Sequence, residues 1–185
     1  MNEYNTRKVT WITYTLYVEL FIVLAGIDQF TKSLITKSFA VAQIKPVINN
    51  FFSLMYVRNK GSAFSLFANQ KWGVTVLSVI SSIAFVIILA IAFFVLAKFK
   101  SRRLCLCLIF LAAGTLGNLI DRIRLHYVVD FLRFDFGSYT FPIFNVADIY
   151  VTLSCIVLAI LLFFSDKFIP EIPFGDKKKD EEDDD

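Results

Sequence analysis

Four long apolar runs, separated by polar segments, set the pattern of this chain. Residues 72–97 carry no charge, residues 104–120 and 149–165 are also uncharged, and residues 9–27 are interrupted only by Glu19. A helix needs about 20 apolar residues to cross the hydrocarbon core of a bilayer, with a lower limit of about 17. The pattern therefore predicts an all-α membrane protein with four transmembrane helices, at about residues 9–27, 72–97, 104–121 and 148–165.

The composition agrees with this class. Of the 185 residues, 57% are hydrophobic and only 19% are charged, whereas about 25% are charged in soluble domains. We expect residues 1–170 to form a single membrane domain whose first span is retained, because no small-residue cleavage motif follows it. Residues 180–185 are all acidic, so we expect residues 171–185 to be a charged, disordered cytoplasmic tail.

Basic residues indicate which side of the membrane each loop faces. They crowd the connection between the second and third spans, and they also precede the first span and follow the fourth (Lys98, Lys100, Arg102, Arg103; Arg7, Lys8; Lys167). Short basic loops stay in the cytoplasm. We therefore expect both termini to be cytoplasmic, and residues 28–71 and 122–147 to form two segments at the outer face of the membrane.

These two outer segments carry strand and turn signals. Alternating side chains run from Phe52 to Arg58 and are followed by turn-forming residues 59–62, which predicts a small hairpin or sheet with residues 63–67. The second segment holds strand-like residues 128–131 and a turn at residues 135–138. We expect a small extracytoplasmic β-rich cradle at the membrane interface, where aromatic side chains suit the depth of the lipid headgroups.

The pattern Asn-x-x-Asp occurs twice, at Asn118 and Asp121 and again at Asn145 and Asp148. The first copy closes the third span and the second opens the fourth, so the predicted topology puts both carboxylates at the outer surface. Two neighbouring carboxylates do not both ionise easily, and such a pair can share a proton and activate water. The chain is therefore a candidate hydrolase with Asp121 and Asp148 as its catalytic residues.

Each aspartate also has a structural interpretation. Asn145 and Asp148 suit the first and fourth positions of a capping box at a helix start. Asp121 lies at a helix C-terminus, where the dipole disfavours a carboxylate, although Arg122 or Arg124 could offset this in an ion pair. From these helix ends we expect Asp148 to be the general base that takes a proton from water, and Asp121 to be the acid that polarises the scissile carbonyl.

Small and polar residues near the two aspartates could support such a site. Gly114 and Gly117 allow helices to approach closely. The amides of Asn118 and Asn145 can donate hydrogen bonds to the aspartates or to a substrate. Arg122 could pair with a carboxylate or with a lipid phosphate.

The remaining candidates lie in the outer segments. Asn59 and Gly61 belong to a loop in which glycine allows close approach of a substrate backbone. Asp28 and Lys32 are four residues apart, which fits either a surface ion pair of little worth or a brace for the cradle that could also meet lipid headgroups. We expect Asp130 to fix its loop by hydrogen bonds rather than to act in catalysis.

The sequence argues against metal or cofactor chemistry. His126 is the only histidine, and Cys105, Cys107 and Cys155 lie in apolar spans without zinc-ligand spacing. We therefore expect no metal, no cofactor and no nucleic-acid partner. Two alternatives to a hydrolase stay open: a small ion- or proton-coupled transporter, whose acids would line a path at mid-depth, and a non-catalytic assembly subunit. Glu19, an acid near mid-membrane, has no assigned role.

Five ordered motifs between about residues 27 and 152 resemble those of lipoprotein signal peptidase (signal peptidase II). The motifs begin at Asp28 (DQFTK), Asn59 (NKGSAFS), Gly114 (GTLGNLIDR), Val128 (VVDF) and Phe144 (FNVAD). The chain departs from the family pattern at Ala113, where glycine is frequent, and at Thr115, where alanine is common. Both replacements keep the residues small, so helix packing should be preserved.

The resemblance implies a four-helix aspartic endopeptidase of the bacterial cytoplasmic (inner) membrane. Such an enzyme removes signal peptides from prolipoproteins, cleaving before a diacylglyceryl-modified cysteine near the outer face, with a β-rich cradle and a short amphipathic segment around the substrate. The resemblance also implies that Asp121 and Asp148 are the catalytic pair, supported by Asn59, Asn118, Arg122 and Asn145. We expect a monomer whose partners are these substrates and membrane lipids.

Overall fold

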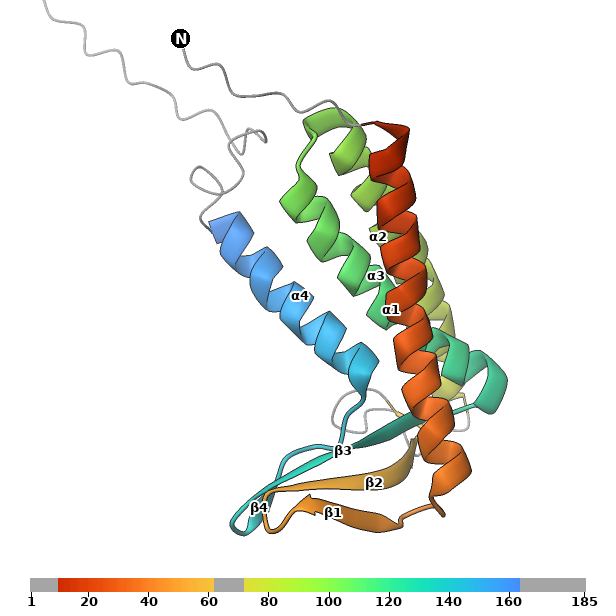
Figure 1. The fold of residues 1–185 in the computed structure, drawn as a ribbon. Helices are drawn as coiled ribbons and strands as arrows, with labels where there is room; N and C mark the ends of the chain where they lie inside the picture. Colours follow the sequence, from red (N-terminus) through yellow and green to blue (C-terminus); the bar gives the residue numbers. More distant parts are fainter. Residues whose placement is uncertain (1–9, 62–71, 164–185) are drawn as a thin grey trace, which may run out of the picture.

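The computed structural model describes residues 10–61 and 72–163. In this part of the chain, four helices form a bundle with a small sheet at one end (Figure 1). Each helix is long and apolar enough to cross a membrane, which confirms the predicted class. The helices are α1 (Trp11–Ser38), α2 (Gly73–Phe99), α3 (Arg102–Leu125) and α4 (Val146–Phe163).

α1 continues well beyond its predicted end at residue 27. Residues 28–38 contain no glycine or proline, and their buried positions, Asp28, Lys32 and Ile35, lie on one helical face. The helix continues past the apolar run because one face of residues 28–38 packs against the rest of the protein. Asp28 and Lys32 therefore lie inside a helix, not in an outer loop as expected from the sequence.

α3 also extends past its predicted end at Asp121 and stops at Leu125. His126 adopts a left-handed conformation with φ of +61°, and its backbone N–H donates to the Arg122 carbonyl at 3.1 Å, which closes the helix. The segment that connects α3 to α4 thus begins at about residue 126 rather than at residue 122.

The sheet consists of β1 (Ile44–Ile48), β2 (Phe52–Asn59), β3 (Val128–Phe136) and β4 (Tyr139–Thr140), all antiparallel and adjacent in this order. It lies across the end of the bundle where α1 and α3 end and α4 begins (Figure 1). The predicted β-rich cradle is therefore confirmed, and we refer to this sheet as the cradle. Residues 63–67, the expected hairpin partner of β2, lie outside the described residues.

The connection from β3 to α4 determines which residues meet at the bundle end. A two-residue turn joins β3 to β4 within the predicted turn at residues 135–138, and Gly137 takes the positive φ of +63° that this turn needs. The chain then returns so that Phe144 pairs with Leu132 on β3, with N–O distances of 2.8 and 3.2 Å. This pairing brings Asn145, the residue that precedes α4, beside Asp130 on β3.

α3 is the central helix, since it contacts α1, α2 and α4. Its buried face includes Cys105 and Cys107, which fill space as small apolar groups, while Cys155 on α4 is exposed. The outward faces of α1, α2 and α4 carry many exposed apolar side chains, as expected for helices that meet lipid. Glu19 lies on such a face of α1 and is exposed.

Two glycines allow neighbouring elements to pack directly onto α3. A Cβ at Gly114 would lie 2.5 Å from the Ala147 carbonyl oxygen on α4, and a Cβ at Gly117 would overlap the Asp28 carboxylate on α1. The close approach that the sequence predicted is therefore confirmed. It places the first turn of α4 and a carboxylate of α1 against the last turns of α3.

The Gly114 contact can be tested with a matched pair of glycine variants. Gly114→Ala forces a methyl group against the α4 backbone, so we expect it to destabilise the protein by about 1–3 kcal/mol. Gly26→Ala is the control, because Gly26 is also helical but has no atom within 4 Å of its Cβ position. We expect that control to be neutral or stabilising by up to about 1 kcal/mol. Equal melting temperatures of both variants in detergent would contradict the packing argument.

Candidate active site

Asn145 and Asp148 form a reciprocal capping box at the start of α4. The backbone N–H of Asn145 donates to Asp148 Oδ2 at 3.0 Å, and the backbone N–H of Asp148 donates to Asn145 Oδ1 at 3.0 Å. This confirms the structural interpretation of the second Asn-x-x-Asp motif. The cap leaves the Asn145 Nδ2 amide and the Asp148 Oδ1 atom available for other partners, and the Asp148 side chain is half-buried.

The amide of Asn118 links the two Asn-x-x-Asp motifs. Its Nδ2 donates to Asp148 Oδ1 at 2.8 Å, and its Oδ1 accepts hydrogen bonds from Asn145 Nδ2 at 3.1 Å and from Lys32 Nζ at 2.9 Å. The prediction that both asparagines donate to polar groups of the site is confirmed. Asp148 therefore accepts an N–H donor at each oxygen, an arrangement that suits the carboxylate anion.

Asp121 is part of a buried ion pair. Its Oδ2 lies 3.1 Å from Lys32 Nζ and accepts the Val129 backbone N–H at 3.0 Å, and its Oδ1 accepts Gln29 Nε2 at 3.2 Å. The sequence suggested Arg122 or Arg124 as the cation, but the cation comes from α1. The carboxylate of Asp121 thus has a buried ammonium as its partner, which its helix position alone did not indicate.

Asp28 completes this ion pair from the α1 side. Lys32 Nζ lies 2.9 Å from Asp28 Oδ2, and the two side chains are 3% and 0% exposed. Asp28 Oδ1 also accepts the backbone N–H of Ala147 at 2.9 Å, which ties α1 to the first turn of α4. The interpretation of Asp28 and Lys32 as a surface ion pair is therefore wrong, because this end of α1 packs against the other helices. The two side chains instead form an internal brace between α1, α3 and α4.

Asp130 is buried between two amides. Asn59 Nδ2 donates to its Oδ2 at 2.9 Å and Asn145 Nδ2 donates to its Oδ1 at 2.7 Å. The pKa of Asp130 is raised to about 7, mainly by burial and also by the negative charge of Asp148, although the two amide hydrogen bonds and the charge of Lys32 act in the opposite direction. Asp130 can therefore exchange a proton near neutral pH.

The sequence assigned Asp130 only a loop-fixing role, which its two amide contacts do support. What the sequence reasoning missed is its position beside Asp148, whose cap residue Asn145 also holds Asp130. A signal was present in the sequence, since Asp130 is a lone acid among the apolar residues 128–132, and the structure shows that it is buried. Gln29, which bonds both Asp28 and Asp121, was also missed because a single amide on a helix carries no pattern.

Arg122 and the residues at the end of β2 complete the site. The charges of Asp148, Asp130 and Asp121 all act on the half-buried Arg122, while its guanidinium donates to Ser81 Oγ on α2 at 3.5 Å. Asn59, the last residue of β2, accepts the Gly61 backbone N–H at its Oδ1 atom, at 2.9 Å. A continuous chain of hydrogen bonds therefore runs from Gly61 through Asn59, Asp130 and Asn145 to Asp148.

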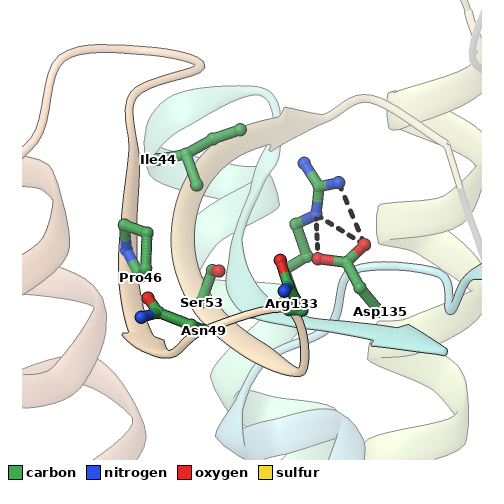
Figure 2. Close-up of a pocket in the computed structure, with 7 residues that line it drawn as sticks. Ile44, Pro46, Asn49, Ser53, Arg133 and Asp135 are labelled. Atoms are coloured by element: carbon green, nitrogen blue, oxygen red, sulfur yellow. Dashed lines mark hydrogen bonds and ion pairs between the residues drawn. The ribbon is translucent and has the colours of Figure 1, made fainter. Parts of the chain in front are cut away.

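A cavity of about 410 Å³ lies elsewhere on the cradle (Figure 2). Arg133 and Asp135 form an ion pair at 2.9 Å beside it, and this pair with its Thr140 hydrogen bond holds the pKa of the Asp135 carboxyl below its usual range. A carboxylate of this kind does not hold a proton at neutral pH. The cavity therefore contains no candidate catalytic pair, and the site is defined by the network at the bundle end.

Four helices that are long and apolar enough to cross a membrane, with a cluster of buried carboxylates and amides at one end, fit a membrane-embedded hydrolase of the aspartic type. The comparisons identify the family. A family model described as signal peptidase (SPase) II matches residues 20–164. The chain therefore belongs to the signal peptidase II family, whose members are aspartic-type endopeptidases.

Relatives and solved structures agree with this assignment. The lipoprotein signal peptidase of Streptococcus agalactiae serotype Ia is 42% identical over 142 residues, 77% of this chain and 88% of that protein. The lipoprotein signal peptidase of Streptococcus pyogenes serotype M5 is 37% identical over 150 residues, 80% of this chain and 93% of that protein. A bacterial membrane enzyme solved in meso at 2.3 Å superposes with a TM-score of 0.70 at 27% identity, covering 87% of this chain and 95% of that chain. A second, at 1.9 Å, gives 0.66 at 28% identity, covering 81% and 94%.

Because the buried Asp130 has a raised pKa, the free energy of unfolding should depend on pH. Its pKa in the folded protein, about 7, lies above its ordinary value of 3.8, so the folded protein binds the proton more tightly than the unfolded chain. The fold should gain stability from this group as the pH falls through about 7, and lose it as the pH rises. Between about pH 8 and pH 5 the gain is on the order of 3 kcal/mol, and Asp130→Asn should lack it.

Melting temperatures measured across this pH range in detergent test the Asp130 prediction. Asp135→Asn is the matched control, because the pKa of Asp135 is lowered and its charge does not change in this range. We expect the control to keep the pH dependence of the wild type. A wild-type pH dependence in Asp130→Asn would show that Asp130 does not titrate there.

Proposed function

We propose that this protein removes signal peptides from prolipoproteins and cleaves before a diacylglyceryl-modified cysteine. The observation that carries this proposal is the pair of carboxylates at the bundle end, Asp130 and Asp148, in a chain of the signal peptidase II family. The transporter alternative is not supported, because the buried acids cluster at one end of the bundle, while Glu19 near the middle of α1 is exposed. The curated relatives are lipoprotein signal peptidases.

In our proposal Asp148 is the general base and Asp130 is the acid. Asp148 keeps the role expected from the helix end, and its two N–H donors, from Asn118 and Asn145, suit the anion. Asp130 replaces Asp121 as the second carboxylate, because Asp130 contacts only amides and its pKa lies near 7, whereas Asp121 is engaged by Lys32. The role of Asp121 is then to hold Lys32 and the start of β3 in place.

The reaction follows from these two roles. Asp148 takes a proton from a water molecule while the water oxygen bonds to the scissile carbonyl carbon, and Asp130 gives its proton to the carbonyl oxygen. As the tetrahedral intermediate collapses, the C–N bond breaks, the amine takes the proton from Asp148, and Asp130 recovers a proton from a hydroxyl of the intermediate. The products are the carboxyl end of the signal peptide and a new amino-terminal cysteine.

We place the active site at the outer face of the bacterial cytoplasmic membrane, with both termini in the cytoplasm. The basic connection between α2 and α3 lies at the bundle end opposite the cradle (Figure 1), and basic loops favour the cytoplasm. The exposed apolar faces of α1, α2 and α4 fit contact with lipid acyl chains, so a monomer surrounded by lipid is sufficient for the proposed reaction.

Cleavage assays with matched substrates test the function. We expect purified protein in detergent to cleave a diacylglyceryl-modified prolipoprotein and to leave the same prolipoprotein intact when its cysteine is unmodified. Product mass spectrometry should place the new amino terminus at the modified cysteine. Equal cleavage of both substrates would overturn the lipid dependence, and a folded protein that cleaves neither would overturn the peptidase assignment.

Separate variants of the two candidate acids decide which one reacts. General acid–base groups contribute about 10²–10⁴-fold to rate, so Asp130→Asn and Asp148→Asn should each lower kcat at least about 100-fold while the protein stays folded. Asp121→Asn should lower the melting temperature and the activity, but its residual activity should keep the wild-type pH profile. If instead Asp130→Asn stays active and Asp121→Asn removes the acid-dependent part of the profile, Asp121 is the reacting acid.

A further inference from the structure

The ammonium of Lys32 has an acceptor for each of its three N–H groups. These acceptors are Asp28 Oδ2 at 2.9 Å, Asp121 Oδ2 at 3.1 Å and Asn118 Oδ1 at 2.9 Å, and Lys32 is only 2% exposed. Two of the three partners are carboxylates, which are sufficient to balance the charge. The third contact, to a neutral amide, satisfies the last buried N–H donor without contributing to charge balance, and it bears on the orientation of that amide.

The carboxylates fix the ammonium in space. Asp28 is held by the backbone N–H of Ala147 on α4, and Asp121 is held by the backbone N–H of Val129 on β3. Lys32 is thus positioned by α1, α3, α4 and β3 together. A donor fixed this firmly can impose an orientation on whatever neutral group it meets.

The neutral group is the amide of Asn118, which has two orientations of nearly equal shape. Its Oδ1 faces two donors, Lys32 Nζ and Asn145 Nδ2, and its Nδ2 faces the acceptor Asp148 Oδ1. Reversing the amide would place its NH₂ group against an ammonium and a second NH₂, and its oxygen against a carboxylate oxygen. Each of these contacts is repulsive, so Lys32 favours one orientation of Asn118.

We propose that Lys32 is a positioning residue for the general base Asp148 and that it acts through the amide of Asn118. In the favoured orientation the amide donates to Asp148 Oδ1, which keeps that carboxylate turned toward the site as an acceptor. Lys32 itself does not contact the reacting atoms. This inference rests on the proposed function, because it takes Asp148 as the base.

Other charged groups surround the same atoms and have to be separated from Lys32 by experiment. In the described part of the chain these are Asp28 on α1, Asp121 and Arg122 on α3, Asp130 on β3, and Asp148 on α4. None of these groups is the donor to Asn118 Oδ1 in question; that cation is Lys32.

A double-mutant cycle tests whether Lys32 acts through Asn118. Lys32→Met should lower kcat about 10–100-fold with little change in KM, because misplacement of a catalytic group by about 1 Å can cost about 100-fold. In an Asn118→Ala background the same change should lower kcat by less than about 3-fold. Full multiplication of the two effects would overturn the proposal. Lys37→Met is the control, since Lys37 is exposed on the same helix, and it should match the wild type.

A charge-matched variant separates positioning from folding. Lys32→Met leaves two buried carboxylates without a cation, whereas Lys32→Met combined with Asp121→Asn restores the net charge of the wild-type trio. We expect this double variant to melt at a higher temperature than Lys32→Met, yet to have a lower kcat than Asp121→Asn alone. A kcat equal to that of Asp121→Asn would show that Lys32 has only a structural role.

An NMR measurement tests the orientation without any cleavage. The side-chain amide of Asn118, labelled with ¹⁵N in detergent-solubilised protein, should give one pair of slowly exchanging NH₂ signals in the wild type and in Lys37→Met. In Lys32→Met and in the charge-matched variant the protons should exchange faster or show two sets of signals. Unchanged signals would overturn the positioning role, even if the wild-type protein does not cleave prolipoproteins.

Discussion

A buried ammonium needs a hydrogen-bond acceptor for each N–H group. The acceptors of Lys32 come from different helices, so its contacts hold the polar end of the bundle together. Its ammonium is shared by carboxylates of α1 and α3, which in turn accept backbone N–H groups from α4 and β3. Hydrocarbon offers no replacement for any of these hydrogen bonds. The cluster also depends on Gly117, because a side chain there would occupy the place of the Asp28 carboxylate. The small residue and the buried charge are therefore parts of one arrangement.

Among the described residues, four aspartates belong to the hydrogen-bond network at this end of the bundle, and their partners divide them into two kinds. Asp28 and Asp121 face an ammonium, whereas Asp130 and Asp148 face amides and backbone N–H groups. Asp28 and Asp121 share one buried ammonium, so their carboxylates hold Lys32 between α1 and α3. The side chain of Asp130 has only amides as hydrogen-bond partners, and its pKa of about 7 lets it change its proton near neutral pH. Environment thus gives one residue type both a structural and a chemical task.

Much of this organisation could be predicted from the sequence, because it depends on local pattern. The presence of four long apolar helices, the capping box at Asn145, the close approach at Gly114 and the cradle were predicted correctly, although the ends of α1 and α3 were not. The pairing of Lys32 with Asp121 was not, since the two residues lie on different helices and no spacing encodes their contact. The helix-dipole argument for Asp121 considered only its own helix, so it omitted a cation from α1. The position of Asp130 near Asp148 was not predicted either, because it depends on the pairing of Phe144 with β3.

The cap of α4 shows why a structural and a functional interpretation of one motif need not compete. The cap uses the backbone N–H and Oδ1 of Asn145, so it leaves the Nδ2 group free to donate to Asp130 and to Asn118. Because the helix start fixes the direction of that amide, it also fixes the carboxylates on either side of it. A cap that held Asn145 less firmly would leave the orientation of Asp130 and Asp148 undefined. The stability of the first turn of α4 is therefore itself a requirement of the proposed chemistry.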